Sequence, residues 1–133
     1  MLEFGEVAIR ATDIAKSGGC QPAEAWNEAV SAVFPHSKSL QDKSCPRATF
    51  LGLCEDGLVV GIPAGSYTRS RDNKAYALTA VECLNANPRL SDVGPDALWK
   101  KVMAGQEKAH NSQMDVVLTL WKRGLIARSC HRR

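Results

Sequence analysis

Apolar residues recur at intervals of three and four along most of the chain, in stretches bounded by prolines and glycines. This spacing places apolar side chains on one face of a helix, while proline suits a first helical turn and glycine the position after the last. The pattern predicts an all-α fold with six main helices. Their bounds are Phe4 to Gly18, Pro22 to Pro35, Pro46 to Gly57, Asp72 to Asn85, Pro95 to Gly105, and Ser112 to Gly124.

One β signal follows the third helix. The segments LVVGI (58–62) and SYTRS (66–70) are β-prone and are separated by PAG. Two such runs joined by a short turn-forming segment predict a small β-hairpin.

The second half of the chain resembles the first. LCEDGLVVG (53–61) and LWKRGLIAR (120–128) each join an apolar helix end to a glycine and a β-prone run. Pro22 and Trp26 recur with the same spacing as Pro95 and Trp99.

The segments AIRATDIA (8–15) and ALTAVECL (77–84) also match in apolar spacing. The matched order predicts an internal repeat of two three-helix units, residues 4–61 and 73–127, followed by a basic tail at 128–133. The alternative is that helices with a proline start and a glycine stop look alike without any duplication.

Composition predicts one compact domain over residues 1–133 in a reducing, cytoplasmic setting. The content of hydrophobic residues is 44%, and no apolar run approaches the roughly 18 to 20 residues of a membrane span. The five cysteines are widely spaced and form no C-x-x-C pair, which argues against a disulfide framework. His36, His110 and Cys20 lack the spacing of metal ligands, so neither a metal nor a cofactor is predicted.

Basic residues gather in the two polar segments that flank the third helix. We expect these segments to converge at the N-terminal end of that helix, where free amides and the helix dipole favour an anion. The prediction is a non-enzymatic nucleic-acid-binding or regulatory module, with nucleic acid or another phosphate-bearing ligand as partner and no membrane. The alternative is that these side chains are simply solvated. The residues are Lys38, Lys43, Arg47, Arg69, Arg71 and Lys74.

Two other functions remain open. One is a protein-interaction module that uses an apolar groove between the two halves. The other is an enzyme with Cys45 as nucleophile, because Cys45 precedes Pro46 near a helix N-terminus and Arg47 is close by, which favours the thiolate. His36 or His110 would then act as the base, whereas a capping or half-buried cysteine is the structural alternative.

The segment KAHNSQMD (108–115) has a simpler local explanation than catalysis. Ser112 and Asp115 are spaced as a capping pair for the sixth helix, and His110 and Asn111 form the turn before it. We therefore expect His110 to point outward.

Two resemblances add to these predictions. The pattern of Leu120, Gly124, Leu125, Ile126 and Arg128 resembles the end of the recognition helix and the start of the wing in winged helix-turn-helix domains. The whole chain resembles a family of small uncharacterised bacterial proteins associated with mobile gene cassettes. That resemblance rests on SKSLQDKSCPRATFLGLC (37–54), GIPAGSYTRS (61–70) and EKAHNSQMDVVL (107–118), and it implies a bacterial setting but no activity.

Overall fold

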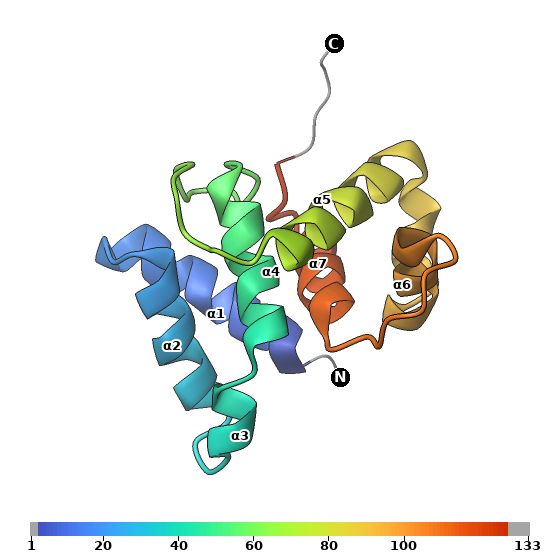
Figure 1. The fold of residues 1–133 in the computed structure, drawn as a ribbon. Coiled ribbons are helices and arrows are strands. Elements are labelled where there is room, and N and C mark those ends of the chain that lie inside the picture. The colour runs from blue at the N-terminus through green and yellow to red at the C-terminus, as the bar shows by residue number, and fades with distance from the viewer. Residues whose placement is uncertain (1–2, 128–133) are drawn as a thin grey trace.

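The fold is all-α, as the sequence predicts. The computed structural model describes residues 3–127, so the predicted basic tail at 128–133 lies outside the described residues. The elements in chain order (Figure 1) are α1 (Glu3–Gly18), α2 (Pro22–Val33), α3 (Lys38–Gln41), α4 (Ser44–Glu55), α5 (Arg71–Ala86), the 3-10 helix η1 (Pro88–Asp92), α6 (Pro95–Met103) and α7 (Gln113–Lys122). The six predicted main helices are α1, α2, α4, α5, α6 and α7, while α3 and η1 are short additions.

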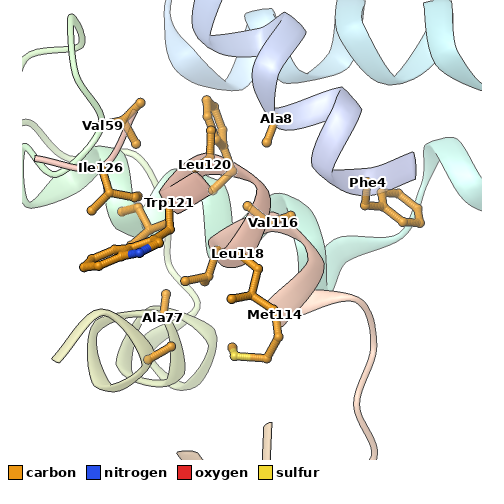
Figure 2. Packing of buried hydrophobic residues seen from close by; sticks show 14 of the residues in the cluster. Phe4, Ala8, Val59, Ala77, Met114, Val116, Leu118, Leu120, Trp121 and Ile126 are labelled. Atoms are coloured by element: carbon orange, nitrogen blue, oxygen red, sulfur yellow. The ribbon is translucent and has the colours of Figure 1, made fainter. Parts of the chain in front are cut away.

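The central helices α4 and α7 connect the two halves of the molecule. The first helix of each half packs on the last helix of the other half, because α1 contacts α7 and α5 contacts α4. Figure 2 shows the result around α7: Val116 and Leu120 lie on the side of Ala8 in α1, and Leu118 lies on the side of Ala77 in α5. The space between the halves is therefore filled by buried side chains.

Two tryptophans anchor the core of the two halves. Trp26 in α2 is 0% exposed and Trp99 in α6 is 6% exposed. Trp26 packs against Phe50, with ring centroids 5.4 Å apart, and Trp99 packs edge-on against Tyr76 at 5.3 Å. Both indoles are thus buried in the core.

Helices α4 and α7 end in the same way. Gly57 and Gly124 both have φ 72°, a left-handed conformation that favours glycine because it lacks a Cβ. The amide of the next residue then bonds back across the last turn, Leu58 N to Leu53 O at 3.0 Å and Leu125 N to Leu120 O at 2.9 Å. This is a Schellman-type cap in both helices.

The predicted β-hairpin after the third helix is wrong. Within residues 3–127 there is no regular strand, and the one isolated bridge pairs Val59 with Ile126 in antiparallel fashion. Val60 N donates to Leu125 O at 2.8 Å, and Ala127 N donates to Leu58 O at 2.7 Å. The first expected strand thus pairs with the segment after α7.

The second expected strand cannot pair with the first because its backbone is bound elsewhere. The Glu55 carboxylate accepts the amide protons of Tyr67 and Thr68, at 2.8 and 2.9 Å. This contact holds the segment against the end of α4. Residues 125–127, which belong to the wing start expected after Gly124, pair with residues 58–60. Arg128, the remaining residue of that pattern, lies outside the described residues.

The segments that pair, 58–60 and 125–127, occupy matching positions after Gly57 and Gly124. A two-fold relation between the units would make matching positions pair with each other. It would also produce two reciprocal hydrogen bonds, as seen here. The internal repeat itself stays a prediction. The superposition of residues 4–60 on 73–127, with Trp26 over Trp99, stays a prediction.

None of the helices in residues 3–127 has the length and apolar content to cross a lipid bilayer.

Candidate ligand-binding site

The six predicted basic residues form two groups of three, one near the start of α4 and one near the start of α5. Three of them surround the start of α4, and their side chains contact neighbouring groups. Lys38 Nζ lies 2.9 Å from Asp42 Oδ1, and Arg47 Nε donates to Asn27 Oδ1 at 3.2 Å. Lys43 Nζ lies over the ring of Phe4, 5.8 Å from its centroid.

The other three lie at or just before the start of α5, where Arg69 and Arg71 are exposed and Lys74 is largely buried. Lys74 Nζ lies 2.8 Å from Glu55 Oε1 and 2.9 Å from Asp56 Oδ1. The hydrogen bond from Lys74, followed by those from the Thr68 and Tyr67 amides, lowers the pKa of Glu55 to about 2.

We call the ion pair Glu55–Lys74, with its two backbone contacts, the α4–α5 latch. The Glu55 side chain is 6% exposed and the Lys74 side chain 18%. The bond to Glu55 also raises the pKa of Lys74, so both groups are charged around neutral pH. The latch fixes the linker between α4 and α5, and Lys74 is committed to this structural contact.

A polar pocket opens where α4, α5 and α7 begin. Its volume is about 320 Å³, and its walls also include part of α6 and the segment between α6 and α7. We call it the polar pocket. It is lined by Cys45, Asp72, Asn73, Tyr76, Trp99, Lys108, Ala109, Asn111 and Gln113.

Carboxamide groups form one wall of the polar pocket. Gln113, which is 3% exposed, accepts the amide proton of Asn111 at 2.6 Å and donates to Asn73 Oδ1 at 3.1 Å. Asn73 in turn donates to Ser70 Oγ at 3.0 Å. Because a carboxamide nitrogen carries two protons, Asn73 and Gln113 each keep one donor beyond this chain of bonds.

Aromatic and charged groups form the opposite wall. Trp99 meets Tyr76 at an interplanar angle of 83°, and its Nε1 donates to the Lys108 carbonyl at 2.9 Å. Lys108 Nζ lies 5.6 Å from the Tyr76 ring centroid and 3.9 Å from Asp72 Oδ2. Tyr76 and then Asp72 raise the pKa of Lys108, so this ammonium stays charged at the rim.

His110 supports the pocket from behind, contrary to the prediction that it points outward. Its side chain is 15% exposed, and its ring lies 5.2 Å from that of Trp99. Nε2 accepts the amide proton of Met114 at 3.0 Å, and Nδ1 lies 3.3 Å from Asp96 Oδ1. Ser112 adopts φ 69° and makes no side-chain cap, so the imidazole caps α7 in its place.

Cys45 lies in the first turn of α4, half-buried on the pocket wall. Both nitrogens of His110 are engaged with other groups, and His36 is exposed between α2 and α3. Across residues 3–127 no histidine nitrogen is hydrogen-bonded to Cys45 Sγ, so neither predicted histidine base contacts this thiol. Burial raises the pKa of Cys54 well above the usual value for a thiol.

Three helix starts meet at the polar pocket. Cys45 lies in the first turn of α4, Asn73 in that of α5, and Gln113 is the first residue of α7. Each helix start carries the positive end of a helix dipole, although at α7 the Met114 amide is already bonded to His110 Nε2. These dipoles favour an anion, and the side chains that line the pocket include one carboxylate and one ammonium.

Sequence reasoning found part of this site. The sequence pattern places Cys45 at a helix start, but it does not indicate that Asn73, Tyr76 or Trp99 would line a pocket. Lys108, Asn111 and Gln113 were missed because they come together with Asn73 only in the folded chain. The available signal was that two helices, α5 and α7, each carry a carboxamide residue in the first turn, Asn73 and Gln113.

The described residues contain no group of three or more His, Cys, Asp or Glu side chains placed to hold a metal ion. Residues 1–127 match DUF6979, which is described as a family of unknown function, and the chain belongs to that family. No curated protein and no solved structure shows significant similarity to the chain.

Proposed function

We propose that this member of a family of unknown function is a non-enzymatic binding module for a phosphate-bearing ligand, with the polar pocket as its site. The supporting observation is the meeting of three helix starts beside Lys108 and the carboxamides of Asn73 and Gln113. Helix starts and ammonium groups are the usual partners of phosphate oxygens.

Charge at the rim is compatible with an anion. Asp72 is the one carboxylate in the lining, and its side chain is 78% exposed, so water screens it. The Lys108 ammonium, 3.9 Å from that carboxylate, is held loosely enough to bind a stronger anion. The helix dipoles of α4, α5 and α7 also favour binding of an anion at this site.

The pocket volume of about 320 Å³ lies at the small end of the usual range for small-molecule sites. A phosphate group reaches such a site either in a free nucleotide-sized molecule or in one unit of a nucleic acid. Lys38, Lys43 and Arg47 surround the start of α4, next to Cys45, and would contact further phosphates of a longer chain. The earlier resemblance adds a bacterial, cytoplasmic setting to this proposal.

The two alternatives have less support. The space between the halves is filled by core side chains, and Val60 and Val93 are the large hydrophobic residues of 3–127 that are exposed. They are isolated, which does not favour an apolar docking groove. For Cys45 catalysis, the described residues lack a base in contact with the thiol.

The experiment compares a mononucleotide with a single-stranded oligonucleotide by isothermal titration calorimetry on the full chain. Lys108→Gln should weaken binding of both, whereas Lys101→Gln, at an exposed lysine of α6, should change neither. Affinity that falls more steeply with salt for the oligonucleotide identifies nucleic acid as the ligand source. Absence of binding by both probes, or binding that Lys108→Gln leaves unchanged, contradicts the proposal.

A further inference from the structure

The two units fill corresponding positions with different chemistry. Matching residues 8–15 with 77–84 places Phe4 opposite Asn73. Matching Trp26 with Trp99 places Phe34 opposite residue 107, next to Lys108. Asn73, which lines the polar pocket, thus corresponds to Phe4. Lys108, which also lines the pocket, is the sequence neighbour of the residue that corresponds to Phe34.

In the first unit this region is closed by aromatic side chains. Phe4 and Phe34 pack with ring centroids 5.0 Å apart, and their exposures are 6% and 8%. Lys43 covers the Phe4 ring. In the second unit Asn73 lines the polar pocket. If the repeat superposes as predicted, the pocket lies at the place that corresponds to the Phe4 ring of the first unit.

We infer that the polar pocket takes the nitrogen-containing aromatic ring of a nucleobase-type ligand. The ring would lie where the first unit holds Phe4, with its polar edge toward Asn73, Asn111 and Gln113. This inference deepens the proposed function and rests on it, since the ring belongs to the same phosphate-bearing ligand.

The chemistry of the walls fits a flat ring with a polar edge. A carboxamide supplies a donor and an acceptor side by side, which is the arrangement that pairs with the edge of a base. The bonds from Asn111 to Gln113 and from Gln113 to Asn73 orient these groups before any ligand binds. Such preorganisation lowers the entropic cost of binding.

The other wall supplies apolar and cationic contacts. Tyr76 and Trp99 present aromatic surface, and the Lys108 ammonium lies at the rim beside Tyr76. Aromatic side chains and cations both pack favourably against bases. A phosphate attached through a sugar would then extend from the ring toward Lys108.

The test measures affinity for four probes with the full chain: inorganic phosphate, ribose 5-phosphate, a nucleoside and its 5′-monophosphate. We expect the nucleoside to bind and its monophosphate to bind more tightly. If ribose 5-phosphate binds as tightly as the nucleotide and the nucleoside does not bind, the base inference is overturned while the proposed function stands. Equal affinity for the nucleoside and the nucleotide supports the base inference and contradicts the proposal that the pocket binds the phosphate group. No binding of any probe overturns both.

Two variants separate recognition of the ring from folding. Asn73→Phe installs the aromatic residue of the first unit and should weaken nucleoside binding by about tenfold or more, since good base-edge contacts carry that order of discrimination. Asn111→Ala changes an exposed side chain, so it should keep the fold and still weaken binding. Glu107→Ala, exposed on the same segment and outside the pocket lining, is the control. Unchanged affinity in Asn111→Ala and in folded Asn73→Phe overturns the inference.

Discussion

The N-terminal and C-terminal units share the way their last helices end but differ where their first helices begin. Gly57 and Gly124 end α4 and α7 with matching caps, and the segments beyond them pair with each other. At the helix starts, the first unit buries Phe4, whereas the second presents Asn73 to a pocket. The matching helix ends join the two halves of the chain, and the differing helix starts include Asn73 of the polar pocket.

The two tryptophans show the same contrast. Trp26 Nε1 is buried without a hydrogen-bond partner, while Trp99 Nε1 donates to the Lys108 carbonyl and so positions the pocket segment. A buried polar group without a partner is costly, and an apolar filling is the simpler way to stabilise a core. A polar network where the other unit uses aromatic rings therefore indicates a role beyond stability.

The largest expected effect comes from truncating either tryptophan. Trp26→Ala and Trp99→Ala should each lower the free energy of unfolding by about 3–5 kcal/mol, because both remove a buried aromatic side chain. Chemical denaturation measures this loss. Under conditions where both variants stay folded, only Trp99→Ala should lose ligand binding. Equal loss of binding in both variants would contradict the proposal that the ligand site belongs to the second unit alone.

The α4–α5 latch should make one side of the molecule sensitive to acid. The pKa of Glu55 is about 2 in the folded chain and about 4.5 without its partners, so the latch stabilises fully above pH 4.5. This contribution is lost as the pH falls from 4.5 toward 2, because protonation then favours the unfolded chain.

Glu55→Gln should cost about 2–3 kcal/mol at neutral pH, as expected when charged hydrogen bonds are lost, and should flatten the decline in stability between pH 4.5 and 2. Denaturation at several pH values tests this expectation. Hydrogen exchange should show α5 opening before α1 as the wild-type protein is acidified. Opening in the reverse order, or an unchanged pH profile in the variant, would assign the acid sensitivity to other groups.

The matching caps should respond alike to substitution. Gly57→Ala and Gly124→Ala each force a Cβ into the left-handed region, which costs about 1–2 kcal/mol. Thermal unfolding of the two variants provides the comparison. Losses that differ by more than about 1 kcal/mol would mean that the two helix ends are alike in geometry but not in energetic role.

Local signals were sufficient to predict the helices. Pro22, Pro95, Gly57 and Gly124 act on their immediate neighbours, so helix starts and ends follow from the sequence itself. The hairpin was wrong because the partner of Val59 lies in the other half of the chain, beyond the reach of a local pattern.

The site was harder to predict for the same physical reason. Lys74 looks like a free cation in the sequence, but folding places it against Glu55 and Asp56. The polar pocket combines Asn73 with Gln113, which are 40 positions apart. Neither the latch nor the pocket has a local signature, because both depend on how the units pack.

We propose that the second unit carries a ligand site at the place where the first unit is closed by aromatic side chains. The most direct measurement is a ¹H–¹⁵N spectrum of the tryptophan indoles during titration with a mononucleotide. The Trp99 indole donates to the Lys108 carbonyl at the pocket, whereas the Trp26 indole lies in the closed unit. We expect the Trp99 signal to shift in a saturable way while the Trp26 signal stays in place. A Trp26 shift of equal size, or an unmoved Trp99 signal at saturating ligand, would contradict it.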